Sequence, residues 1–387
     1  MDIKKEVSSI KDYIIELRRH FHKNPEPSWK EFETSEFIKR ELKKLKIPFE
    51  KIAKTGIIAK IGKGNRKIAL RADIDALEIE ELNDKEYKSE KKGLMHACGH
   101  DGHIAMLLGA GKILKKYESE LKGEVRLIFQ PAEELGDGAK EIIKDGGLEG
   151  VDNIFGIHLW SGLETGKISI IPGEIMASAD LFSIKIKGKG GHGSMPHQGV
   201  DAAVIGASVV LNLQTIVSRE ISPLEPTVVS VGKIVSGTRY NIIAHEALIE
   251  GTVRSFNDEI RQTIPERIKR ISENIAKAHR AEAELEYIWG PPPLKNDTES
   301  AERAKKCAKS LFGGDSINNP IGKIMAAEDF AYYLKEVSGI FVFVGSGNKE
   351  KGTDFPHHHP KFDIDEDALF VGASLHIKYA LDFLNKN

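Results

Sequence analysis

The sequence predicts an α/β fold in which a first domain with a doubly wound sheet is interrupted by a smaller α+β domain of ferredoxin-like order. Two observations lead to this. Strand-like and helical segments alternate over residues 104–160, which is typical of a sheet with helices on both faces. Later strands alternate apolar and charged residues, as half-exposed antiparallel strands do. We therefore expect a first domain of residues 1–178 and 291–387, with residues 179–290 as an inserted second domain.

The first domain opens with helices. Residues 10–46 carry apolar side chains at a spacing of three to four, with a break at "NPEPS". Two strand-like runs follow at 55–62 and 67–75, and the Gly-Asn turn signal in "GKGN" between them predicts a hairpin. The elements expected next are a helix at 104–117, a strand at 124–131, a helix at 138–146 and a strand at 153–160.

The inserted segment reads as strand, helix, strand, strand, helix, strand, which is the ferredoxin-like order. Its helical stretches are 201–217 and 258–280, and its last strand is 283–290. The proline run "PPP" that begins at residue 291 cannot continue a strand interior, so it marks the end of the segment. Alternating helix and strand then return to the C-terminus.

Composition excludes several functional classes. The 56 basic and 58 acidic side chains give a net charge of −2, without the positive excess that a nucleic acid attracts. No run approaches about 18 apolar residues and the N-terminus is a charged amphipathic segment, so we expect neither a membrane span nor a signal peptide. Two cysteines are too few for a disulfide framework, which points to a reduced, cytoplasmic protein.

Residues 95–103, "MHACGHDGH", gather three histidines, a cysteine and an aspartate. A thiolate and an imidazole are good ligands for a divalent transition metal, and the thiolate can bridge two ions. Because Cys98 and His100 are two residues apart, a turn at Gly99 is needed for both to face one ion. A buried free cysteine in a histidine-rich loop is the alternative.

Four further segments carry residues of the same chemistry. Glu133 and Glu134 follow the 124–131 strand at its carboxyl end, where open α/β sheets build their sites. One can bind a metal while the other takes a proton, or both can be acidic residues that start a helix. His158 interrupts an apolar strand as a ligand or as a core histidine. The segment 354–362 offers three consecutive histidines, and Asp73 and Asp75 end another strand, as supports of a site or as loop starters.

Together these segments resemble a known family. The stretches "LRADIDAL", "MHACGHDGH", "FQPAEE", "GIHLW", "GKGGHGSMPH", "AEDFAYYL" and "HHPKFDIDEDAL", in this order, are similar to the metal-dependent amidohydrolases. That group includes hippurate hydrolases, indole-acetyl-amino-acid hydrolases and N-acetyl-diaminopimelate deacetylases, within the glutamate carboxypeptidase and aminoacylase superfamily. The resemblance covers essentially the whole chain and implies a zinc-peptidase-like catalytic domain with an inserted lid and dimerisation domain.

The resemblance also implies roles for individual residues. Two divalent metal ions per subunit are expected; the thiolate favours zinc, with manganese or cobalt as alternatives. Glu133 is expected to be the general base and His192 the residue that stabilises the oxyanion. Asn241 is expected to help position the substrate, although in its motif "YNIIA" this chain has Ala244 where the family pattern has proline. Arg254 is expected either to pair with a substrate carboxylate or to be a structural residue of its strand. The expected metal ligands are Cys98, His100, Glu134, His158 and His358, the last because the family's ligand stands two residues before a proline.

The expected activity is hydrolysis of the amide bond of an N-acyl amino acid by a cytoplasmic homodimer or higher homo-oligomer. The nearest alternative is a metallocarboxypeptidase acting on short peptides, which uses the same chemistry. A protein that only binds a metal or ligand is the alternative from another class. The adjacent Glu133 and Glu134 argue against it, since a pure binder has no need of a base.

Overall fold

The computed structural model describes residues 1–385, which divide into two compact units. The first unit comprises Met1–Gly173, Lys295–Gly322 and Asp329–Asn387, and the second comprises Glu174–Leu294 and Lys323–Glu328. The expected domain limits at 178/179 and 290/291 lie within a few residues of the main breaks between these units. The expected limits place residues 323–328 in the first domain, whereas in the structure they belong to the second unit.

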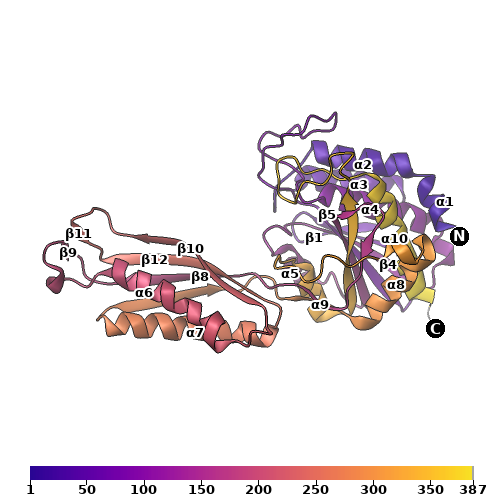
Figure 1. Cartoon of the computed structure of the whole chain (residues 1–387). Coiled ribbons are helices and arrows are strands. Elements are labelled where there is room, and N and C mark those ends of the chain that lie inside the picture. Colours follow the sequence, from indigo (N-terminus) through magenta and orange to yellow (C-terminus); the bar gives the residue numbers. More distant parts are fainter. Residues whose placement is uncertain (386–387) are drawn as a thin grey trace. The chain divides into compact units, whose positions relative to one another are not determined.

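A mixed sheet of seven strands forms the centre of the first unit within residues 1–385 (Figure 1). β3, β4, β5 and β15 run parallel to their neighbours in this group, whereas β1, β2 and β6 are antiparallel additions. In sheet order the strands are β1 (Phe49–Ile52), β2 (Gly56–Gly62), β4 (Glu124–Gln130), β3 (Lys67–Asp73), β5 (Asn153–Glu164), β15 (Gly339–Gly347) and β6 (Ile168–Ser169).

Helices cover both faces of this sheet (Figure 1). The parallel strands are buried along nearly their whole length, because each of their faces is covered. Helices α4 and α10 contact one another over one face, and α5 and α9 contact one another over the other. The helices of this unit are α1 (Ile3–Ser8), α2 (Lys11–Lys23), α3 (Phe32–Lys44), α4 (His100–Lys116), α5 (Gly138–Lys144), α8 (Thr298–Phe312), α9 (Phe330–Glu336) and α10 (Asp367–Asn385).

The predicted hairpin between residues 55–62 and 67–75 is wrong. Both strands exist, but β4 lies between them and pairs with each, antiparallel to β2 and parallel to β3. The turn signal does mark a reversal of chain direction between β2 and β3. The pairing partner came from sixty residues further along the chain, which a local turn pattern cannot reveal.

The second unit holds a four-stranded antiparallel sheet in the order β10-β12-β8-β13. Its elements follow the predicted ferredoxin-like order, and the alternation along β8 buries Phe182, Ile184 and Ile186 beneath the helices. The elements are β8 (Asp180–Lys187), α6 (Ala202–Thr215), β10 (Thr227–Ser236), β12 (Glu246–Ser255), α7 (Asp258–Ala278) and β13 (Glu282–Ile288). A separate ribbon pairs β9 (Gly191–His192) with β11 (Ile242–Ile243).

The expectation that no segment is long and apolar enough to span a membrane needs a correction. Helix α6 continues into η3 (Ile216–Glu220), and the combined helix Ala202–Glu220 reaches a mean hydropathy of 1.4 over an 18-residue window. By length and composition alone it could cross a membrane, a test that core helices of soluble proteins also pass. Only 33% of that window is buried in the chain.

Candidate metal centre

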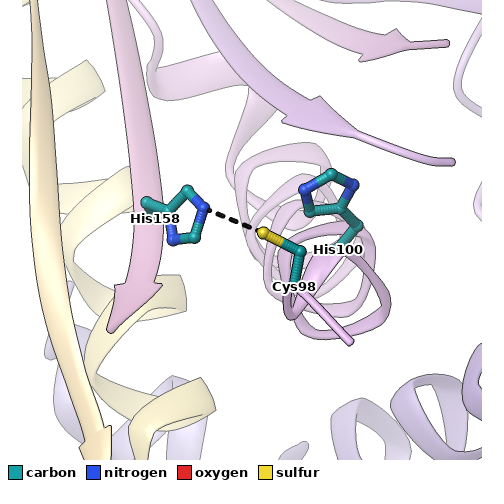
Figure 2. A group of neighbouring side chains, drawn as sticks. All are labelled: Cys98, His100 and His158. Carbon is teal, nitrogen blue, oxygen red and sulfur yellow. Dashed lines mark hydrogen bonds between the residues drawn. The ribbon is translucent and has the colours of Figure 1, made fainter. Parts of the chain in front are cut away.

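The turn at Gly99 brings Cys98 and His100 to one side of the chain. Gly99 has a φ of 90°, in the left-handed region that only glycine adopts without strain, and His100 is the first residue of α4. Their side chains meet His158 from β5, as Figure 2 shows. Ligand atoms of the three residues lie within 4.8 Å of one another, and Cys98 Sγ is 3.5 Å from His158 Nε2.

The parallel strands explain why segments so distant in sequence meet here. The carboxyl ends of β3 and β4 lie at the same edge of the sheet, where Asp73 pairs in register with Gln130. On the other side of β3, Arg71 pairs with Gly156, so His158 lies at the level of that same edge. The loops that leave this edge carry the other predicted side chains.

Buried carboxylates hold the acidic pair after β4. Ala132 has a φ of 51°, so its backbone turns sharply and must be restrained. Glu31 Oε1 accepts a hydrogen bond from the Ala132 amide at 3.0 Å. Asp75 accepts from the amides of Glu133 and Glu134 at 3.2 and 3.1 Å. These bonds aim both side chains at His100, whose Nε2 is 3.9 Å from a carboxylate oxygen of each.

His358 reaches the same cluster from the loop between β15 and α10. Its Nε2 lies 3.6 Å from Glu134 Oε2, and its ligand atom is within 4.8 Å of those of Cys98 and Glu134. The next histidine, His359, instead stacks on Phe355 with ring centroids 4.8 Å apart. The first unit thus brings together all the predicted ligands, which are Cys98, His100, Glu134, His158 and His358.

Backbone carbonyls orient two of these imidazoles. His100 Nδ1 donates to the carbonyl oxygen of Asp75 at 2.9 Å, and His158 Nδ1 donates to that of Leu159 at 2.6 Å. A carbonyl oxygen can only accept, so each Nδ1 carries a proton, and in the neutral ring each Nε2 presents a lone pair to the cluster. This is how proteins prepare histidines that bind metals.

The electrostatics of the cluster fit bound cations. Burial raises the pKa of the Cys98 thiol well above its usual value and that of Glu134 to about 7, while burial lowers the pKa of His158 and His358. Burial also opposes the charge of His100, but Asp73 and Cys98 outweigh it and raise the pKa of that ring. Within residues 1–385, His100 Nε2 and Glu134 Oε1 are buried without a hydrogen-bond partner. Divalent cations would satisfy these atoms and replace the protons.

Two supporting residues escaped the sequence analysis. His103 accepts a hydrogen bond from the Leu159 amide at Nε2, at 2.9 Å, and its Nδ1 lies 2.6 Å from Asp73. It therefore ties α4 to β5 beside His158, and its presence in the motif at 95–103 was a usable signal. Glu31 carried no such signal, because a single glutamate in a charged segment looks like any surface residue.

The second unit holds the remaining predicted residues. His192 is exposed on β9 opposite Ile242, and the Gly193 amide donates to the carbonyl oxygen of Asn241 at 2.8 Å, so His192 and Asn241 are neighbours. His192 Nδ1 accepts from the Ser194 amide at 3.1 Å, which leaves Nε2 as the proton carrier of the neutral ring. Arg254 lies apart from that ribbon, half-buried on β12 opposite Val228.

Comparisons with known proteins agree with this architecture. Residues 69–382 match the family described as Peptidase family M20/M25/M40. The chain is 46% identical to an N-acyl-L-amino acid amidohydrolase of Geobacillus stearothermophilus, over 78% of this chain and 83% of that protein. It is 40% identical to thermostable carboxypeptidase 2 of Saccharolobus solfataricus, over 99% and 98%. A crystal structure of a dinuclear metal-binding peptidase from Bacillus subtilis superposes with a TM-score of 0.86 at 35% identity, covering 98% of this chain and all of that one.

Proposed function

Because the chain belongs to peptidase family M20/M25/M40, we propose that it is a metal-dependent hydrolase that binds two divalent metal ions and cleaves the amide bond of N-acyl amino acids. The observation that carries the proposal is the convergence of Cys98, His100, Glu134, His158 and His358 at one edge of the sheet, with Glu133 beside them. When bound, two divalent cations supply Lewis acidity and lower the pKa of water toward neutrality.

Residues of the chain are proposed to bind the cations and to transfer the protons. The ligand atom of Cys98 lies within 4.8 Å of those of His100 and His158, and also of those of Glu134 and His358. Cys98 is therefore the candidate for a thiolate shared between the two cations. Glu133 is held by Asp75 yet is not needed as a ligand, so we assign it the proton transfers. Its carboxylate takes a proton from the attacking water as the new C–O bond forms, and gives it to the leaving nitrogen as the C–N bond breaks.

His192 is proposed to stabilise the oxyanion of the tetrahedral intermediate. Its Nε2–H is a hydrogen-bond donor, and its exposure leaves it open to a substrate. Asn241, its neighbour, is proposed to position the substrate. Arg254 is proposed to pair with the substrate's carboxylate, although burial lowers its pKa and it lies on β12 rather than on the ribbon that carries His192.

A second candidate activity is carboxypeptidase action on short peptides, which the similarity to thermostable carboxypeptidase 2 favours. The two activities share one mechanism and differ in what lies on the acyl side of the scissile bond. The test is turnover of metal-reconstituted protein on a panel of N-acetyl amino acids, N-benzoyl amino acids and dipeptides. Faster cleavage of the N-acyl amino acids supports the proposal, whereas preference for dipeptides overturns it in favour of the alternative. Metal binding without turnover of any member indicates a binding protein.

We also propose that the chain forms a homodimer through the second unit. β10 is an edge strand whose Ile234 and Val235 are about half exposed, and the adjoining helix α6 exposes Val204 and Leu211. An open strand edge beside an apolar helix face suits pairing with a second copy. Leu211→Glu should therefore give monomers in sedimentation experiments. Ile288→Glu, on the opposite edge strand β13 and 53% exposed, is the matched control.

The proposed compartment is the reducing cytoplasm. Cys98 and Cys307 are both unpaired in the structure, and the assigned ligand role of Cys98 requires its thiolate. Oxidation of Cys98 would remove that ligand, so the activity is expected to need reducing conditions.

A further inference from the structure

The three consecutive histidines at 357–359 have separate surroundings. His358 faces the cluster and His359 stacks on Phe355, which leaves the role of His357 open. The ring of His357 packs between Trp160 and Phe362, with centroids 4.6 and 5.1 Å away. Its Nε2 lies 3.0 Å from the carbonyl oxygen of Leu159. His357, in the loop between β15 and α10, therefore donates a hydrogen bond to β5.

The acceptor of this bond is the same oxygen that orients His158. The Leu159 carbonyl receives His158 Nδ1–H at 2.6 Å and His357 Nε2–H at 3.0 Å, one for each lone pair. The amide of the same residue donates to His103. The backbone of one residue, Leu159 of β5, thus links three histidine rings, and each of the three segments that meet there carries a proposed ligand.

The loop that carries His358 needs such a restraint. His358 has a φ of 64°, which is strained for a residue with a side chain, and its loop has no helix or strand of its own at this point. Two of the hydrogen bonds that hold this loop run to segments with proposed ligands. The amide of His358 donates to the carbonyl oxygen of Ala97 at 2.8 Å, next to Cys98, and His357 bonds to Leu159, next to His158.

We propose that His357 is a positioning residue of the metal centre: through its bond to the Leu159 carbonyl it sets the separation between His158 and His358. It is not one of the proposed ligands. The inference rests on the proposed ligand roles of His158 and His358 and adds a residue that supports them from outside the ligand set.

The test is metal affinity, measured on full-length metal-free protein by titration with Zn²⁺ in competition with a chromogenic chelator. His357→Phe keeps an aromatic ring beside Trp160 but has no N–H. It should weaken at least one of the two binding steps by about 10–100-fold, the usual effect of removing a partner that orients a ligand. The thermal unfolding midpoint of the metal-free protein should stay near that of the wild type.

Three variants make the result specific. In His357→Gln the amide nitrogen lies close to the place of Nε2, so most of the affinity should return, whereas His357→Met has similar length and no donor. The Gln and Met pair decides the question if the Phe variant does not fold. His359→Phe changes the neighbouring histidine and should bind both ions as the wild type does.

His358→Ala separates the two hypotheses under test. If it binds both ions normally, the ligand assignment itself fails. If it loses an ion while His357→Phe and His357→Met bind both with wild-type affinity, only the positioning role is overturned. Equal weakening by His359→Phe, or equal affinity of the Gln and Met variants, also overturns it.

Discussion

The metal centre of the first unit and the His192 ribbon of the second unit are built in opposite ways. The ligand side chains of the first lie at a sheet edge, and both His100 and His158 are tied by Nδ1 to a backbone carbonyl. His192 is exposed on a two-residue strand, and its ring is hydrogen-bonded to Ser194, two residues away. Ligands that must fit an ion need fixed positions before it binds, whereas a group that meets the substrate must remain reachable.

This contrast predicts separate functions for the two regions. The first region is predicted to bind metal and move protons with no help from His192, and the second is predicted to affect turnover while leaving metal affinity unchanged. The predictions below run from the largest expected effect to the smallest, and the first two test that separation directly.

Glu133→Gln should lower kcat by about 10²–10⁴-fold, because it removes the proton carrier and keeps the shape of the side chain. Metal content should stay near that of the wild type. Glu134→Gln is the matched control one residue along, and it should lose metal instead. The reverse pattern, with Glu133→Gln losing metal, would exchange the two roles.

His192→Ala should lower kcat by about 10²-fold or more, as loss of one oxyanion donor does, with metal content unchanged. If His192 acts across a dimer, mixing this variant with Glu133→Gln restores one complete site in each hybrid. Since half of the randomly mixed dimers are hybrids, about one quarter of wild-type activity should return. No recovery, despite proven subunit exchange, would mean that each chain uses its own His192.

Alkylation of Cys98 should be at least about tenfold slower in the metal-loaded protein than after chelation, because a bound thiolate is not a free nucleophile. Cys307 is the internal control. It is 1% exposed, burial raises its pKa to about 12, and it lies in α8 away from the cluster, so metal should not change its labelling. Mass spectrometry of the labelled peptides measures both cysteines in one sample. Equal labelling of Cys98 in the two states would rule out the thiolate ligand.

The smallest effect concerns stability in acid. Burial raises the pKa of Asp363, but the buried guanidinium of Arg18, 2.7 Å away, and His22 outweigh burial, so the pKa is lowered. A lowered pKa stabilises the fold above the unfolded value of about 4, and this contribution is lost as the pH falls through the folded value. Asp363→Asn should lower the unfolding midpoint by a few degrees at pH 7 and by less near pH 3. A constant difference across this range would contradict the ion pair's role.

The sequence predicted the order of elements well, because apolar periodicity reports directly on local structure. Pairing was harder, since the strand that lies between β2 and β3 arrives from far along the chain. At the site, residues with distinctive chemistry such as Cys98 and the triplet at 357–359 could be found. Asp75 could be named as a possible support but Glu31 could not, because both act by accepting hydrogen bonds from backbone amides, whose positions cannot be read from the residue pattern.

The central claim is that Cys98, His100, Glu134, His158 and His358 hold two divalent cations beside Glu133. Its most direct test is the number of metal ions per chain, measured by plasma mass spectrometry after reconstitution and desalting. We predict two ions in the wild type and in Glu133→Gln, fewer than two in each single ligand variant, and loss of both in Cys98→Ala, whose thiolate is shared. Two ions retained by Cys98→Ala would contradict the account.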